Sequence, residues 1–168
     1  MSKSELTEMG LNVQNFIVPY SDWSENRRDL AMEYYNSVGA GKHNGYFNDI
    51  PPDDPYWLAR KPIINEIYED GTSVDVVKSW VDQAISEDTW LILMLHCIGD
   101  EESRLYWSEE NLEALVKWVN TQDILVVTQQ QGLALAAIPI PSSWILILSG
   151  IGITAAIRKK LNSGRKRN

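Results

Sequence analysis

The feature that most restricts the fold of this chain of 168 residues is a run of 20 residues without charge at positions 138–157. As a helix, such a run spans about 30 Å, which is the thickness of the hydrocarbon core of a bilayer. Pro139 and Pro141 fit best in a first helical turn, so we expect a helix at 142–157, roughly 24 Å long. Apolar residues cover every face of that helix, which is typical of a spanning helix. The run therefore predicts a transmembrane or sorting segment in residues 138–168.

The net charge of −8 is distributed unevenly along the chain. Residues 138–168 contain six basic and no acidic side chains, so residues 1–137 carry −14, the difference between −8 and +6. The positive-inside rule places the basic end in the cytoplasm and the acidic body, residues 1–137, outside. An acidic body repels phosphate backbones, and no basic face with interleaved aromatic residues offsets this repulsion. We therefore expect no binding to nucleic acid.

The tail "IPIPSSWILILSGIGITAAIRKK" resembles the PEP-CTERM class of bacterial C-terminal sorting signals, in the variant with Val-Pro-Leu-Pro at its start. The resemblance implies an exported, membrane-anchored or cell-surface protein of exopolysaccharide-producing bacteria, with an exosortase as a processing partner. A plain tail anchor is the alternative. The start of the chain, "MSKSELTEMG", is polar and lacks the pattern of a signal peptide. Export therefore predicts a further segment upstream.

The first 135 residues alternate between predicted strands and helices. In chain order, the predicted elements are a strand at 11–18, a helix at 21–38, a loop at 39–57, a helix from 73, a strand at 90–98, a helix after 108 and a strand at 123–128. Ser21 or Ser24 is the candidate cap of the first helix. This order indicates an α/β domain with parallel strands and helical crossovers.

Apolar periodicity is clearest in the later elements. From Ser73, apolar pairs recur at 76–77, 80–81 and 84–85, and the helix capped by Ser108 is expected to turn four residues inward: Leu112, Leu115, Val116 and Val119. The predicted strands at 90–98 and 123–128 lack polar alternation. We therefore expect both strands to be buried on both faces, as in parallel sheets.

Chemically versatile side chains gather in the stretch "LILMLHCIGD", residues 91–100. His96 comes late in its predicted strand, and functional side chains of α/β proteins collect at the carboxyl ends of parallel strands. A structural role for a lone histidine remains open from position alone. Cys97, the single cysteine, excludes an internal disulfide and a multi-thiolate metal site. It points away from the face of His96 in a strand, so we expect it to pack as a small apolar residue.

Two long stretches resemble the polysaccharide deacetylases of the NodB-homology type. The first is "ELTEMGLNVQNFIVPYSDWSENRRDLAMEYY" and the second is "VVKSWVDQAISEDTWLILMLHCIGDEESRLYWSEENLEALVKWVNTQDILVVT". The resemblance implies hydrolysis of the acetamide C–N bonds of N-acetylated glycans on a distorted parallel (β/α) barrel. Residues 1–135 would form its C-terminal half as a truncated domain, followed by one hydrophobic helix.

Site residues follow from the resemblance position by position. His96 would be the general acid that protonates the departing amine, and Met94 stands in place of the usual leucine. Pro19 and Tyr20 match the motif whose tyrosine backbone N–H stabilises the oxyanion. Ile17 stands where the family commonly has an arginine.

The remaining motifs match weakly or are missing. Asp53 and Trp57 fall near an Asp/Trp substrate motif, although a solvated Pro/Asp turn is the alternative interpretation. The early aspartate pair and the His-x-x-x-His metal motif have no counterpart, and His43 is expected in a loop. The family uses a divalent metal such as zinc to activate water. We therefore expect no metal site in this chain and no activity from the chain alone.

A second hypothesis comes from a different class of protein. The same fold could serve as a non-catalytic, membrane-anchored surface module that binds glycan or a partner chain. Three aromatic side chains would then form the binding platform: Trp23, Trp57 and Trp107.

Overall fold

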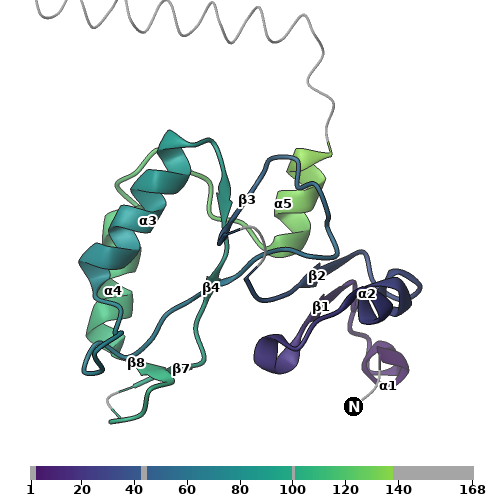
Figure 1. Cartoon of the computed structure of the whole chain (residues 1–168), viewed down its shortest axis with the longest axis horizontal. Helices are drawn as coiled ribbons and strands as arrows, with labels where there is room; N and C mark the ends of the chain where they lie inside the picture. Colours follow the sequence, from purple (N-terminus) through teal and green to yellow (C-terminus); the bar gives the residue numbers. More distant parts are fainter. Residues whose placement is uncertain (1–2, 43–44, 100, 138–168) are drawn as a thin grey trace, which may run out of the picture. The chain divides into compact units, whose positions relative to one another are not determined.

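The computed structural model describes residues 3–42, 45–99 and 101–137 of the chain (Figure 1). The chain divides into two units, Met1–Ala136 and Ala137–Asn168, and nearly all described residues belong to the first. The apolar helix predicted at 142–157 lies outside the described residues. None of the helices within residues 3–137 is long and apolar enough to cross a membrane.

The described elements are short helices and strands that alternate along the chain (Figure 1). In order they are α1 (Lys3–Glu8), β1 (Asn15–Ile17), the 3₁₀ turn η1 (Pro19–Ser21), α2 (Glu25–Met32), β2 (Ser37–Gly39), β3 (Phe47–Asn48), β4 (Lys61–Pro62), α3 (Val74–Ser86), β5 (Trp90–Leu91), β6 (Leu93–Met94), β7 (Cys97–Ile98), β8 (Tyr106–Trp107), α4 (Glu109–Val119) and α5 (Gln129–Ala136).

Parallel pairing connects four successive extended segments. Strand β1 pairs in parallel with β2, Gly39 forms a parallel bridge with Leu58, and β4 pairs in parallel with β6. The segment at 58–62 therefore joins the two strand pairs. All four segments run in one direction: β1, β2, 58–62 and β6. The pairs β3–β5 and β7–β8 are antiparallel and parallel, respectively. Within the described residues these small sheets form no closed barrel.

The first predicted helix is shorter in the structure than its sequence pattern indicates. Helix α2 ends at Met32, and Ser37–Gly39 form strand β2 instead of the last helical turn. Val38 is fully buried, and its backbone N–H donates to the carbonyl of Pro55 at 2.9 Å. Pairing with β1 thus overrides the helical periodicity of this segment. Ser24 is the N-cap, although its side chain makes no capping hydrogen bond.

The structure confirms the two helices predicted after Ser73 and Ser108, which are α3 and α4. Ser73 caps α3 by accepting a hydrogen bond from the Val76 N–H, and Ser108 caps α4 by accepting one from the Asn111 N–H. The inward face of α4 includes Leu115, which is buried, but not Val116, which is 49% exposed. The prediction of an inward Val116 is therefore wrong, because the buried face of α4 is narrower than the apolar face that the sequence pattern predicts.

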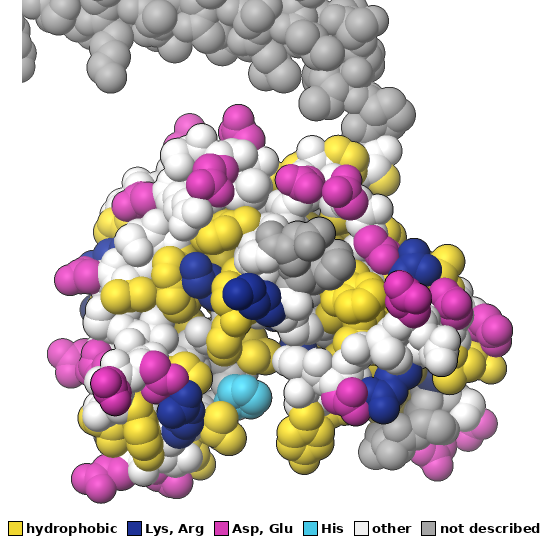
Figure 2. All heavy atoms as spheres, viewed as in Figure 1, with side chains coloured by type: hydrophobic (Ala, Val, Ile, Leu, Met, Phe, Trp, Pro, Cys, Tyr) yellow, Lys and Arg dark blue, Asp and Glu magenta, His cyan; other side chains and the backbone are white. Residues whose placement is uncertain are grey.

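Two clusters of buried side chains form the core. The first joins Val18, Ala31, Val38 and Ala40, and the second joins Ile63, Val77, Trp107 and Leu115. Acidic side chains are scattered over the face shown in Figure 2, as the composition requires.

Trp107 occupies the interior of the second cluster. Its side chain is 2% exposed, and its indole N–H donates to the Thr72 carbonyl at 2.8 Å. Trp107 therefore cannot be a glycan platform, and this part of the binding-module hypothesis is wrong. The physical reason is that strand β8 turns this ring inward between α3 and α4.

The two apolar runs predicted as fully buried strands are not buried on both faces. Residues 90–95 are half-buried and residues 96–98 are exposed, because the helices α3 and α4 provide one covering layer. Residues 124–127 form no strand in the structure, and Leu125 and Val126 are each 77% exposed. The latter segment has no strand beside it within the described residues, so its hydrophobicity alone does not produce pairing.

Candidate functional site

The turn at Pro19–Ser21 follows directly on the carboxyl end of β1 and has an uncommon backbone conformation. Tyr20 and Ser21 both have φ of 56°, in the left-handed region, and the Tyr20 side chain is 100% exposed. A non-glycine residue in such a conformation costs roughly 1–3 kcal/mol and persists only where its surroundings hold it. No apolar burial of Tyr20 compensates for this strain. Strain of this kind is typical of functional turns.

Neighbouring backbone holds the turn from both sides. The Val18 N–H donates to the Gly39 carbonyl at 3.0 Å, and the Asp22 N–H donates to the Pro19 carbonyl at 3.3 Å. A Cβ atom at Gly41 would lie 2.7 Å from the Cβ of Ser21. Gly41 therefore allows the chain after β2 to approach the turn closely, and a larger residue would displace it.

His96 lies two residues beyond the end of β6. Its side chain is exposed, and no described residue forms a hydrogen bond with its ring. Met94 ends β6 opposite Pro62 and is half-buried. The imidazole is thus accessible from solvent, while the residue two positions before it is anchored in a strand pair.

Cys97 differs from its prediction. It is exposed at the start of β7, so it does not pack as a small apolar core residue. The cause is the same as for the neighbouring residues: the second face of this segment has no covering layer within the described chain.

Tyr20 and His96 lie at the same edge of the parallel arrangement. Both follow carboxyl ends of strands that run in one direction, β1 and β6, with β2 and segment 58–62 between them. Three strand spacings correspond to about 14 Å across a flat sheet. By the register of the pairs, His96 also lies three residues further along the strand direction than the level of Tyr20.

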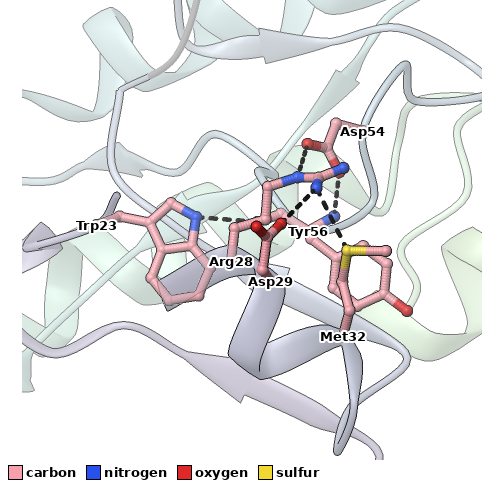
Figure 3. A network of polar contacts seen from close by, with 6 residues as sticks. All are labelled: Trp23, Arg28, Asp29, Met32, Asp54 and Tyr56. Atoms are coloured by element: carbon pink, nitrogen blue, oxygen red, sulfur yellow. Dashed lines mark hydrogen bonds and ion pairs between the residues drawn. The ribbon is translucent and has the colours of Figure 1, made fainter. Parts of the chain in front are cut away.

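The Pro/Asp segment before Trp57 is an ordered turn connected to α2 (Figure 3). The carboxylate of Asp54 accepts a hydrogen bond from the Arg28 Nε at 2.6 Å and another from the Tyr56 N–H at 2.9 Å. The hydrogen bond to Asp54 raises the pKa of Arg28. The Trp23 indole N–H donates to the Tyr56 carbonyl at 3.1 Å. Asp54, and not the predicted Asp53, therefore provides the carboxylate that shapes this turn.

The two weakly predicted residues of this segment have different surroundings. Asp53 is exposed, whereas Trp57 is half-buried and packs against the first core cluster. A structural turn accounts for the observed contacts of this segment.

Arg60 is a buried residue that the sequence patterns did not single out. Its side chain is 6% exposed, its Nε donates to the Ala40 carbonyl at 2.6 Å, and its Nη2 donates to the Val18 carbonyl at 3.0 Å. Burial lowers the pKa of its guanidinium. The available signal was a pair of adjacent charged residues, Arg60 and Lys61, within the otherwise apolar stretch "WLARKPII".

Lys61 lies among aromatic rings. Its Nζ is 4.2 Å from the centre of the Trp80 ring and 4.7 Å from that of Phe47. Burial lowers the pKa of this lysine. No carboxylate of a described residue forms an ion pair with it, so the rings provide its electrostatic partners.

A cavity of about 870 Å³ lies between α1, α2 and β1. Four aromatic residues contribute to its lining: Phe16, Trp23, Tyr34 and Tyr35. Neither Tyr20 nor His96 lines it. This cavity keeps Trp23 as a possible binding platform of the second hypothesis, in contrast to Trp107.

Metal-binding groups do not gather within residues 3–42, 45–99 and 101–137. No three side chains of His, Cys, Asp or Glu in these ranges come close enough to hold one ion. His43 lies outside the described residues. The expected lack of a metal site stays a prediction.

Comparisons with protein-family models, with curated proteins and with solved structures find no match to this chain.

Proposed function

We propose that residues 3–137 form one side of a deacetylase site for N-acetylated glycans. In this proposal His96 is the general acid and the backbone N–H of Tyr20 stabilises the oxyanion. The observation that carries the proposal is the strained turn at Tyr20, whose side chain is fully exposed. This turn follows strand β1, and His96 follows strand β6, which runs in the same direction. The resemblance of the sequence around both residues provides the reaction class.

The chemistry requires two separate contributions from these residues. Water attacks the acetyl carbonyl carbon and produces a tetrahedral oxyanion, which a preorganised N–H stabilises most strongly in the transition state. The C–N bond then breaks, and the departing amine takes a proton from the imidazolium of His96. A histidine is suited to this task because its ordinary pKa lies near neutral pH.

Activation of the water is not assigned to this chain. The described residues do not fit the three-ligand site that a hydrolytic metal needs, so none of their proposed roles involves a metal. We propose that a second polypeptide segment contributes the base and the metal ligands. The chain alone is then inactive and binds substrate without hydrolysing it.

Titration with an N-acetylglucosamine oligomer tests the proposal directly. The full chain in detergent micelles would be followed by NMR at the Tyr20 amide and the His96 ring. We expect both signals to shift along one saturation curve, because one ligand touches both groups. The fully N-deacetylated oligomer is the matched control, and it should cause no shift at Tyr20.

Two results would contradict the deacetylase proposal. One is the absence of any binding. The other is a response confined to the aromatic cavity at Phe16 and Trp23, which would favour the non-catalytic module instead.

The proposed location follows from the tail. We propose a membrane-anchored or cell-surface protein with the acidic body outside, held by residues 142–157 until an exosortase removes the tail. The support is the charge-free run and the basic end of the sequence. A role in exopolysaccharide metabolism is consistent with an acidic body that acts on glycans.

A further inference from the structure

Arg60 needs a physical explanation because its charge is buried without an ionic partner. Its side chain is 6% exposed, and no carboxylate of a described residue lies within ion-pair distance of it. Burying an unpaired charge costs several kcal/mol unless polar groups compensate. In this structure the compensation comes from two backbone carbonyl groups, those of Val18 and Ala40.

Those two carbonyls belong to the residues that immediately follow β1 and β2. Arg60 therefore ties the carboxyl ends of both strands to segment 58–62. Its own backbone position is held in turn, because the side-chain oxygen of Asn48 accepts from the Ala59 N–H at 2.7 Å and its side-chain nitrogen donates to the Ala59 carbonyl at 3.0 Å. Gly39 leaves space for the Arg60 side chain, since a Cβ there would lie 3.1 Å from the Arg60 Cδ.

The carbonyl of Val18 is the last backbone group before the strained turn. The ring of Pro19, the residue after Val18, restricts the φ angle of Pro19 itself to about −65°. The Pro19 carbonyl in turn accepts from the Asp22 N–H. The Pro19 carbonyl and the Tyr20 N–H belong to one peptide plane, which the Asp22 N–H contacts, and Arg60 holds the carbonyl of the plane before it.

We propose that Arg60 is a positioning residue that aims the Tyr20 N–H at the acyl oxygen of the substrate. It acts through the Val18 carbonyl and does not touch the substrate itself. Its positive charge, placed beside this carbonyl, also favours negative charge developing near the turn. This inference rests on the proposed function for the role of the N–H, whereas the control of the turn's conformation does not depend on it.

Lysine is the informative replacement at this position. It keeps the positive charge, but its single ammonium lacks the planar fork that donates from Nε and Nη2 to two separate carbonyls. Arg60→Gln serves as a second, neutral variant in case Arg60→Lys does not fold. Arg104→Lys is the matched control, because Arg104 is exposed and forms its ion pair with Asp70 on the surface.

The first measurement needs no ligand. In the full chain in micelles, the three-bond coupling between the amide and α protons of Tyr20 reports its φ angle. We expect Arg60→Lys to change this coupling and the Tyr20 amide shift, while signals of Val77 and Trp107 stay in place. Arg104→Lys should leave the Tyr20 signals unchanged. An unchanged Tyr20 coupling in folded Arg60→Lys would overturn the proposal.

The second measurement adds the N-acetylglucosamine oligomer. We expect folded Arg60→Lys to lose most of the glycan-induced shift at the Tyr20 amide while His96 still responds, with the dissociation constant changed less than about tenfold, or 1.4 kcal/mol. Equal loss at Tyr20 and His96 would mean a general structural role and overturn the proposal. If the wild-type chain binds no glycan, the proposed function fails, and the coupling measurement still decides whether Arg60 controls the turn.

Discussion

At the residue scale, the structure contains side chains whose environment opposes their usual preference. Tyr20 has a left-handed backbone and a fully exposed ring, and Arg60 has a charge inside the protein. These two residues are joined through the Val18 carbonyl. Conflicts between local preference and tertiary structure are expected at functional sites, where selection retains an unfavourable geometry.

The strain at Tyr20 makes a quantitative prediction. Tyr20→Gly should raise the free energy of unfolding by about 1 kcal/mol relative to Tyr20→Ala, because glycine adopts positive φ without steric cost. Both variants remove the same exposed ring, so their difference isolates the backbone. Urea unfolding of the two variants measures it. Equal stability of the glycine and alanine variants would mean that the turn is not strained.

Trp107 offers a test of the second core cluster. Trp107→Ala should lower the free energy of unfolding by about 3–5 kcal/mol, through the lost contacts and the cavity that remains. Leu125→Ala is the matched control, since Leu125 is largely exposed, and it should change stability by no more than about 0.5 kcal/mol. Chemical denaturation monitored by circular dichroism measures both. Similar losses for the two variants would contradict the burial of Trp107.

Lys61 makes a pH-dependent prediction. Burial lowers its pKa below the ordinary value of 10.5 that applies to the unfolded chain. Between the lowered pKa and 10.5, the unfolded chain binds more protons at this residue, so its contribution to stability increases as pH rises through that interval. NMR titration should show Lys61 losing its proton below the ordinary value of 10.5. Loss of the Lys61 proton at or above the ordinary value of 10.5 would contradict the prediction.

At the scale of elements, helices α2, α3 and α4 each follow a serine. They differ in whether that serine accepts a hydrogen bond from a backbone N–H of the first helical turn. The hydroxyls of Ser73 and Ser108 accept from backbone N–H groups of α3 and α4, whereas the side chain of Ser24 makes no such bond at α2. The sequence pattern is the same for all three serines, because each precedes an amphipathic segment. The structure distinguishes them by geometry.

This difference predicts unequal effects of the same substitution. Ser73→Ala and Ser108→Ala should each lower the free energy of unfolding by about 1 kcal/mol, since each leaves a helical N–H without its partner. Ser24→Ala is the internal control and should have an effect near zero. Thermal unfolding of the three variants side by side measures the comparison. A loss at Ser24 equal to that at Ser73 would show that its hydroxyl caps α2 in solution.

At the scale of the whole molecule, charge divides the chain into two parts of opposite sign. The acidic body carries −14 and residues 138–168 carry +6. The first 20 residues of this tail, 138–157, carry no charge. Such a distribution favours a body in water and a tail in a membrane with its basic end on the cytoplasmic side.

Deletion of the tail tests this division. The full chain should sediment with phospholipid vesicles, and the chain without residues 138–168 should stay in the supernatant, because the apolar run provides the membrane affinity. A chain whose residues 142–157 are replaced by a polar sequence of equal length controls for the basic end. Full-length protein that remains soluble without detergent or vesicles would contradict the membrane prediction.

Much of the helical structure could be predicted from the sequence, in contrast to the strand pairing. The residues around α3 and α4 contain their own period and caps within a dozen positions, so local information is sufficient there. The sequence pattern predicts helix where strand β2 lies and a buried strand at 123–128, and the structure shows neither. Whether an apolar segment becomes a strand depends on a partner elsewhere in the chain, and no local pattern contains that information.

By itself, the sequence determined the starts of the capped helices α3 and α4, the opposite charges of body and tail, and the two candidate positions Tyr20 and His96. Only the tertiary structure decided that Tyr20 stands in a left-handed turn and that Trp107 faces the core. It also decided that Arg60, 42 residues beyond Val18 in the chain, holds the Val18 carbonyl. The physical reason is range: helix periodicity and charge are properties of neighbouring residues, whereas burial and backbone strain arise from contacts between segments that folding brings together.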